Sequence, residues 1–243
     1  MPTLTVNHFT IGKEVRIAVS LMATNRESLF TQLPLIENSS AHIIEWRLDY
    51  LLDRNDIIEL LKEIKKKTTK LILVTFRREE EGGVSPISSE EYFNLLKKII
   101  NSKQADLVDI ELSLGKSSIK ELHHYADKTG TKLLYSAHFF SHTPSVNQMI
   151  EILKEMEELK ADVTKLAVMP KNSSDVLQLL QVTDYWRNFA TVPYLTISMG
   201  ELGKITRYSG QVFGSCITFA CIGEPSAPGQ MEVETLKNVI ELL

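Results

Sequence analysis

The chain of 243 residues is long enough to bury a sizeable core, and its 43% apolar and 24% charged residues are typical of a globular protein. A formal net charge of −4 favours neither nucleic acid nor an acidic membrane surface as a partner. Two cysteines, Cys216 and Cys221, are too few for a disulfide framework, and the sequence shows no secretory segment or bilayer-length apolar run. We therefore expect a cytoplasmic protein.

Short apolar, β-branched runs recur along the chain at fairly even intervals and predict strands. They lie at 15–20, 42–48, 71–76, 107–112, 132–137, 163–168, 194–198 and 216–220. Helical patterns separate most of these runs, and the clearest covers residues 145–160. Ser88 and Glu91 form a predicted capping box, and residues 173–175 are expected to cap the helix that follows them.

The alternation of strands and helices predicts a parallel sheet, because successive parallel strands need a crossover connection. Eight strands without a break in composition favour a (β/α)8 TIM barrel. We expect one catalytic barrel domain over residues 1–243, with residues 1–14 forming a short N-terminal hairpin cap. A doubly wound open sheet is the alternative, although no glycine-rich fingerprint follows the first strand.

Within five consecutive predicted strands, one face is apolar and the other becomes polar towards the C-terminal end. The apolar face requires helices over it, so the polar face is expected to point into the barrel. This polar set comprises Glu45, Arg47, Thr75, Arg77, Asp109, Glu111, Ser136, His138 and Lys165. The set is either a structural ion network or a catalytic site, and barrel enzymes place their sites at the C-terminal ends of the strands.

Lys165 stands in the middle of an apolar run and is the most informative residue of the set. Loss of solvation and nearby arginines would both lower its pKa. A neutral amine attacks carbonyl groups and forms a Schiff base, which acidifies the adjacent C–H bond. His138, at the end of the neighbouring strand, is a candidate general acid and base near neutral pH.

The C-terminal third supplies further candidates for the mouth of the barrel. Residues 198–215 are glycine-rich and are predicted to form a flexible loop that contains Arg207, which could grip a carboxylate or a phosphate. Residues 224–230 combine proline and glycine, which predicts a loop and possible lid over the site.

An ordered set of motifs resembles the type I 3-dehydroquinate dehydratases. The motifs are "EWRLD" (45–49), "TFR" with Glu81-Gly82-Gly83 downstream, "SAHFF" (136–140), "KLAVMP" (165–170), "SMGELGKITR" (198–207), "FGS" (213–215) and "PSAPGQ" (225–230). Two positions depart from the pattern that is common in the family. Phe139 stands where Asp or Asn is frequent, and Thr206 stands where Ser is frequent.

The resemblance implies a lyase that dehydrates 3-dehydroquinate to 3-dehydroshikimate in the shikimate pathway of aromatic amino-acid biosynthesis. It also implies a (β/α)8 barrel, commonly a homodimer, that needs no metal or organic cofactor. By similarity, Lys165 matches the Schiff-base lysine, His138 the general acid and base, and Glu81 the carboxylate that orients the histidine. The matched substrate-binding residues are Glu45, Arg47, Arg77, Arg207, Ser226 and Gln230.

Two other functions remain open at this point. A different Schiff-base enzyme, such as a class I aldolase, would also carry a lysine on a central strand. Its sugar-phosphate substrate would need a phosphate site after the last two strands. A non-catalytic binding protein on the same fold is the alternative from another functional class.

Overall fold

Eight parallel strands form the centre of the protein in the computed structural model, which describes all 243 residues. The strands are β3 (Arg16–Leu21), β4 (Ile43–Arg47), β5 (Leu71–Thr75), β6 (Leu107–Glu111), β7 (Lys132–Phe139), β8 (Val163–Val168), β9 (Tyr194–Ser198) and β10 (Ile217–Ala220). Their order is β10-β3-β4-β5-β6-β7-β8-β9, and the N–H of Cys216 donates to the carbonyl of Tyr194 (2.9 Å) where the two edges meet. This nearly closed barrel confirms the predicted (β/α)8 fold and excludes the open sheet.

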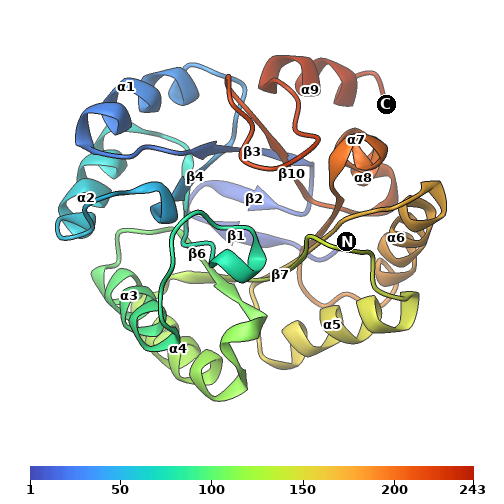
Figure 1. Cartoon of the computed structure of the whole chain (residues 1–243), viewed down its shortest axis with the longest axis horizontal. Helices are drawn as coiled ribbons and strands as arrows, with labels where there is room; N and C mark the ends of the chain where they lie inside the picture. Colours follow the sequence, from blue (N-terminus) through green and yellow to red (C-terminus); the bar gives the residue numbers. More distant parts are fainter.

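Helices surround the strands as a ring (Figure 1). They are α1 (Arg26–Glu37), α2 (Ile57–Lys67), α3 (Ser89–Ser102), α4 (Lys116–Thr129), α5 (Val146–Glu158), α6 (Ser173–Trp186), α7 (Gly200–Gly203), α8 (Ile205–Phe213) and α9 (Val233–Ile240). Three 3-10 turns follow strand ends: η1 (Leu48–Tyr50), η2 (Glu79–Glu81) and η3 (Leu112–Leu114). No helix has both the length and the apolar character needed to cross a bilayer.

Alternate strand residues belong to two separate cores, as the sequence pattern predicts. The larger core lies between strands and helices and includes Ile44, Trp46 and Leu166. The smaller core fills the inside of the barrel and includes Ile43 and Leu73. The polar residues that alternate with the outer core therefore face inward, and they are concentrated at the C-terminal ends of the strands.

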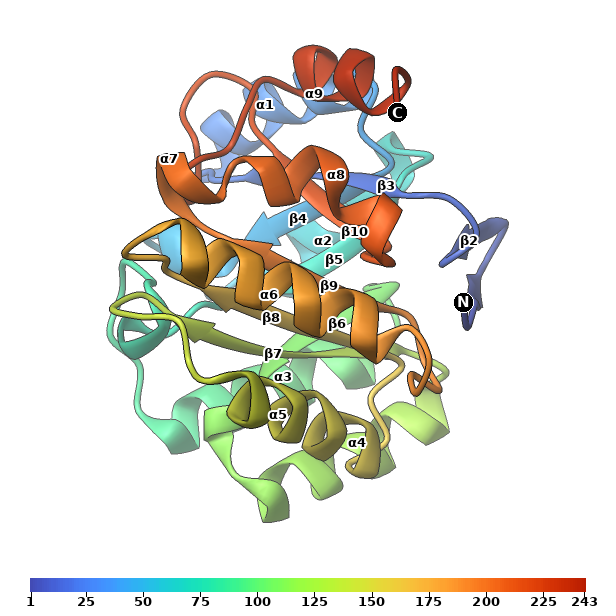
Figure 2. The same cartoon turned by 90° about the vertical axis from the view of Figure 1, so that its right-hand side faces the viewer.

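The hairpin of β1 (Leu4–Val6) and β2 (Phe9–Ile11) closes the opposite, N-terminal end of the barrel. Figure 2 shows it beside the starts of the strands, whose arrowheads point away from it. Ile11 is fully buried in the inner core, and the side-chain amide of Asn7 donates to Asp106 (2.9 Å). The carbonyl of Thr10 also accepts the Nε–H of Arg16 (3.1 Å), so the predicted N-terminal cap is confirmed as an apolar plug with polar anchors.

The predicted helix caps are partly correct. Ser88 and Glu91 form the expected reciprocal capping box at the start of α3. At α6, however, Asn172 is the N-cap, and its side chain accepts the backbone N–H of Asp175. The prediction of residues 173–175 was wrong because a helix places its cap one residue before the first helical position, and Asn there is as effective as Ser.

Residues 198–215 are not a flexible loop, as the glycine content suggested, but contain the helices α7 and α8. Gly203 serves close packing, since a Cβ at this position would lie 2.2 Å from the carbonyl oxygen of Ser198. Arg207 therefore projects from a helix packed against β9, and this gives its guanidinium group a fixed position.

Candidate active site

All nine residues that the family resemblance assigns to the site line one cavity at the C-terminal end of the barrel, whereas Thr75, Asp109, Glu111 and Ser136 of the inward polar set do not line it. The nine are Glu45, Arg47, Arg77, Glu81, His138, Lys165, Arg207, Ser226 and Gln230. The space enclosed by these residues is about 470 Å³, including the part that is open to solvent. Apolar side chains complete its wall, among them Ile197, Met199 and Phe219.

Lys165 lies on the inner face of β8 and is 6% exposed. Its Nζ is 3.7 Å from Glu45 Oε1, 3.9 Å from Asp109 Oδ2, and 4.2 Å from the centre of the Phe219 ring. Burial lowers the pKa of the amine; Glu45 and Asp109 oppose this change, whereas Arg77 and Arg47 reinforce it. The net effect is a pKa below the usual lysine value, which increases the fraction of neutral, nucleophilic amine.

Two guanidinium groups beside Lys165 are fixed by carboxylates. Arg47 makes a bidentate contact with Asp49 (2.8 and 2.7 Å), which follows β4 in η1. Arg77 donates to Asp109 (2.6 Å) and to Glu111 (2.9 Å), both in β6. The ion network considered from the sequence is therefore present, and it surrounds the cavity.

The carboxylate of Glu45 is held on the other side of the amine. It accepts the hydroxyls of Ser20 (2.5 Å) and Thr75 (3.2 Å). Burial raises the pKa of Glu45, but the nearby charges of Lys165 and Arg47 outweigh burial, so the net shift is downward. Glu45 is therefore ionised at neutral pH and provides a fixed negative charge in the cavity.

Glu81 reaches His138 from η2, the short turn after β5. Its Oε2 lies 2.9 Å from Nδ1 of His138 and accepts the backbone N–H of the same residue (3.1 Å). The chain folds back tightly here, because a Cβ at Gly83 would lie 1.8 Å from the carbonyl oxygen of Arg77. The double glycine after Glu81 thus lets the turn bring this carboxylate to the histidine.

The surroundings of the Glu81–His138 pair favour a neutral imidazole. Burial, together with the charges of Arg77 and Lys165, lowers the pKa of His138 well below its usual value. Burial and the negative charge of Glu111 raise the pKa of Glu81 to about 7. When Glu81 is ionised, it accepts the Nδ1–H of His138 and leaves Nε2 with a free lone pair, as a general base requires.

Arg207 has no carboxylate partner, in contrast to Arg47 and Arg77. Its Nη2 donates to the carbonyl of Pro228 (2.8 Å) and its Nη1 to the carbonyl of Phe219 (3.4 Å), while its buried Nε has no partner. Burial lowers the pKa of this guanidinium to about 10. A buried cation without a counter-ion is costly, so this corner of the cavity is suited to an anion.

The segment that contains Ser226 and Gln230 lies over the cavity. The Gln230 side chain accepts the backbone N–H of Ser226 (2.8 Å), and the Ser226 hydroxyl lies 2.8 Å from that of Ser20. The carbonyl of Pro228 also accepts the N–H of Gly200 at the start of α7 (3.1 Å). These contacts close the predicted lid over the barrel mouth.

Several residues of the site were missed at the sequence level. Ser20 in β3 and Phe219 in β10 both face inward. The alternation of inward and outward side chains that predicted the other inward residues would have found them, had it been applied to these two strands. Asp49 lies beyond the end of its strand, where alternation gives no guidance. Thr206 retains a hydroxyl at the position where the family commonly has serine, and this hydroxyl accepts the N–H of Ser198 (3.0 Å).

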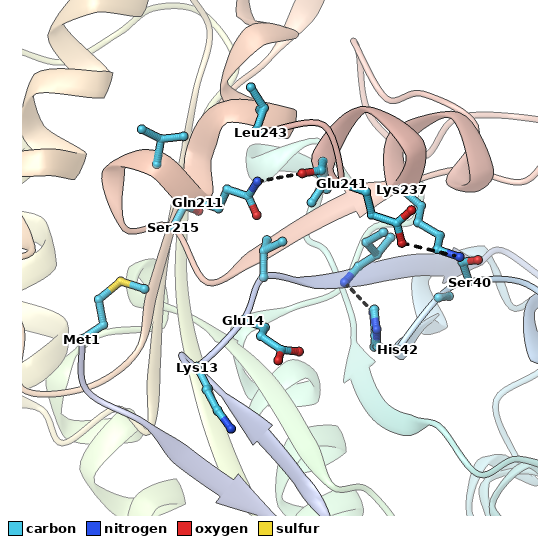
Figure 3. A pocket seen from close by; sticks show the side chains of 15 residues that line it. Met1, Lys13, Glu14, Ser40, His42, Gln211, Ser215, Lys237, Glu241 and Leu243 are labelled. Carbon is cyan, nitrogen blue, oxygen red and sulfur yellow. Dashed lines mark hydrogen bonds and ion pairs between the residues drawn. The ribbon is translucent and has the colours of Figure 1, made fainter.

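A larger hollow opens at the other end of the barrel, beside the hairpin and helices α8 and α9 (Figure 3). Its empty volume is about 1670 Å³, and its charged lining residues include Lys13, Glu14, Lys237 and Glu241. None of the predicted site residues lies in it, and it is at the end of the barrel that enzymes of this fold use for stability.

Comparisons with known proteins identify the family of the chain. The family model of type I 3-dehydroquinase matches residues 17–243. The chain is 36% identical to 3-dehydroquinate dehydratase of Enterococcus faecalis, over 99% of this chain and 98% of the relative. It is 39% identical to that of Neisseria gonorrhoeae, over 99% and 97%.

Solved structures of known proteins share the fold of this chain. Type I 3-dehydroquinate dehydratase from Clostridium difficile superposes with a TM-score of 0.95 at 35% identity, over 100% of this chain and 98% of the other. Orotidine 5'-monophosphate decarboxylase from Methanocaldococcus jannaschii, at 20% identity and a TM-score of 0.61, shares the fold alone. The full-length match in sequence and structure shows that the chain belongs to the type I 3-dehydroquinase family of hydro-lyases.

Proposed function

We propose that the chain dehydrates 3-dehydroquinate to 3-dehydroshikimate through a Schiff base on Lys165, with His138 as general acid and base. The observation that carries this proposal is the buried amine of Lys165, whose pKa is lowered mainly by burial, in a cavity shared with the Glu81–His138 pair. An amine in this state can attack a ketone, and a neutral imidazole can accept a proton.

In the first half of the reaction, the Lys165 amine attacks the C3 carbonyl of the substrate. The carbonyl oxygen leaves as water, and a protonated imine remains. His138 Nε2 then removes a proton from C2, and the electron pair of that C–H bond moves towards the imine to give an enamine. Glu81 stabilises the imidazolium that forms, through its contact with Nδ1.

In the second half, the enamine expels the C1 hydroxyl group, which takes its proton from His138 and leaves as water. Hydrolysis of the resulting conjugated iminium consumes one water molecule and frees both the product and the Lys165 amine. The net change is the loss of one water molecule from the substrate, and His138 ends in the protonation state in which it began.

Substrate binding follows from the distribution of charge in the cavity. In our proposal, Arg207 binds the substrate carboxylate, because it is the cavity guanidinium without a carboxylate partner. Glu45, Arg47 and Arg77 surround the hydroxyl groups and the reacting centre, and Ser226 and Gln230 close the site from the lid. These assignments leave no need for a metal or an organic cofactor in the proposed steps.

A relative of known structure contains a covalently modified ligand. The structure of the Clostridium difficile enzyme is described as containing covalently modified comenic acid. A covalent adduct requires a nucleophile, and Lys165 is the cavity residue in this chain whose amine is buried with a lowered pKa.

The test is an assay for the conjugated enone of the product, which absorbs in the ultraviolet. We expect the absorbance to rise when 3-dehydroquinate is added to the wild-type protein, and to stay at the background rate with Lys165→Ala. An aldolase would instead cleave a sugar phosphate and leave 3-dehydroquinate unchanged. A wild-type protein without enone formation would refute the proposed reaction.

The proposal also covers the pathway, the domain organisation and the oligomeric state of the protein. The reaction serves the shikimate pathway of aromatic amino-acid biosynthesis, residues 1–243 act as one catalytic domain, and the active form is a homodimer. Six of the 13 exposed large apolar residues belong to the segment from α6 to α8, whose helices lie on the near side in Figure 2, and this supports a self-association surface there. They are Leu177, Tyr185, Phe189, Leu202, Ile205 and Val212. The cytoplasmic location expected from the sequence stays a prediction.

A further inference from the structure

Ser113 is an exposed residue in η3 whose hydroxyl connects two charged groups at the edge of the cavity. It accepts a hydrogen bond from Nη2 of Arg78 and donates its own hydrogen to Oε1 of Glu81. The other oxygen of Glu81, Oε2, contacts the ring and the backbone N–H of His138. The two oxygens of Glu81 are therefore held by different elements, η3 on one side and β7 on the other.

We propose that Ser113 is a positioning residue for the reaction, because its hydroxyl holds Glu81 in the orientation in which Oε2 accepts the Nδ1–H of His138. This inference rests on the proposed function, in which His138 is the general base. Ser113 does not line the cavity, so it acts on the substrate only through Glu81 and His138.

Arg78 gives the serine a defined orientation. Its Nε and its backbone N–H both donate to Glu111 (2.6 and 2.9 Å), and its guanidinium carbon lies 5.2 Å from the centre of the Tyr92 ring. With Arg78 fixed in this way, the serine oxygen is used as an acceptor by a cation, and its hydrogen is directed to Glu81. A donor polarised by a neighbouring cation forms a stronger hydrogen bond to a carboxylate.

The hydrogen bond from Ser113 affects the protonation of Glu81, because opposing charges surround this carboxyl group. Burial and the carboxylates of Glu111 and Asp109 favour the protonated form of Glu81, whereas Arg77 and the Ser113 hydroxyl favour the ionised form. Arg77 Nη1 is 3.9 Å from Oε2, and His138 faces the same oxygen from β7. With its pKa raised to about 7, Glu81 changes protonation within the working range of pH.

The direction of the effect follows from these contacts. Ionised Glu81 accepts the Nδ1–H of His138 and leaves Nε2 free to act as a base, whereas protonated Glu81 can donate to Nδ1 and so favours the tautomer with its hydrogen on Nε2. Loss of the Ser113 hydroxyl raises the pKa of Glu81, so the fraction of ionised Glu81 at pH 7 falls. The acid limb of the pH–rate profile must then move to higher pH, and activity must recover at alkaline pH.

The test compares Ser113→Ala with Ser113→Thr, which keeps the hydroxyl, and with Ser117→Ala, a control at an exposed serine of α4. For Ser113→Ala we expect the acid limb of kcat to shift upward by about one pH unit, the size of one charge-assisted hydrogen bond. KM should change less than kcat, and the two other variants should follow the wild type. A Ser113→Ala profile that coincides with the wild type would overturn the proposal.

A second measurement does not depend on turnover. Nitrogen NMR of the His138 ring in the substrate-free protein reports the Nδ1–H tautomer as a function of pH. We expect the pH at which this tautomer is lost to rise in Ser113→Ala and to return in Ser113→Thr. If the wild type does not dehydrate 3-dehydroquinate but the NMR shift is present, the proposed function fails and the Ser113 contact stands; without an NMR shift, the role of Ser113 is refuted.

Discussion

Lys165 is buried between opposing charges, which modify the pKa of its amine. The arginines that lower its pKa are tied to Asp49, Asp109 and Glu111, so their own positive charge is partly compensated. Glu45 and Asp109 oppose the downward shift. The sequence predicts the inward direction of Lys165 and the nearby cations, but it does not give the distances at which the carboxylates act. Burial is the largest cause of the lowered pKa of Lys165, and the paired charges modify this pKa further.

Arg207 gives a direct test of substrate recognition at the residue scale. We expect Arg207→Ala to reduce kcat/KM by roughly 10- to 100-fold, the range for loss of a hydrogen-bonded charged partner. Steady-state kinetics with 3-dehydroquinate will measure this loss. Arg26→Ala is the matched control, because Arg26 is exposed and pairs with Glu63 on the helical surface. An unchanged kcat/KM in Arg207→Ala would show that the carboxylate binds elsewhere.

The role of the lid segment after β10 can be tested with two matched glycine substitutions. Gly223 directly precedes this segment and Gly229 lies near its end, and their φ angles are positive, at 71° and 81°. A Cβ at Gly229 would lie 2.4 Å from the carbonyl oxygen of Gly200, whereas a Cβ at Gly223 would meet no atom within 4 Å. The backbone strain of alanine is thus similar at both positions, and only Gly229 contacts α7.

We expect Gly229→Ala to keep the lid from closing on α7, which raises KM and lowers kcat. Gly223→Ala should lose stability by about 1 kcal/mol from the strained φ angle and retain most of its activity. Kinetics and thermal unfolding of both variants separate the two effects. Equal activity losses in the two variants would contradict a role for the lid contact with Gly200.

Sequence reasoning succeeded for the strands and was weaker for the connections. Strand parity predicted the inward face of Lys165 and His138, because alternation in a strand has only two outcomes. Glu81 lies in a turn, where no periodicity applies, so its role came only from the family resemblance. The glycines of residues 198–215 were read as flexibility, whereas Gly203 provides room for a packed helix.

At the scale of the whole molecule, the two ends of the barrel are closed by different segments. The hairpin plugs the N-terminal end with Ile11, and the lid covers the C-terminal end with Ser226 and Gln230. The sequence predicted both segments from their position relative to the strands. It could not predict the contacts of Ser113, because an exposed serine in a short turn carries no pattern that indicates its partners.

The proposed homodimer is tested at the same scale. We expect light scattering of the wild type to give twice the chain mass of 27.5 kDa. Leu177→Glu and Phe189→Glu should shift the particle towards the monomer, because stable interfaces bury about 1,600 Å² and tolerate few charges at their centre. Leu52→Glu, at an exposed residue away from α6, is the control and should leave the mass unchanged. A wild-type monomer at micromolar concentration would contradict the proposal.

Covalent trapping tests the central claim most directly. The protein is mixed with 3-dehydroquinate and borohydride, which reduces an imine to a stable amine, and the modified peptide is identified by mass spectrometry. We predict one adduct, located on Lys165, none in Lys165→Ala, and a retained adduct in His138→Ala despite a fall in kcat of roughly 10²- to 10⁴-fold. No adduct in the wild type during turnover, or an adduct on another lysine, would contradict the account.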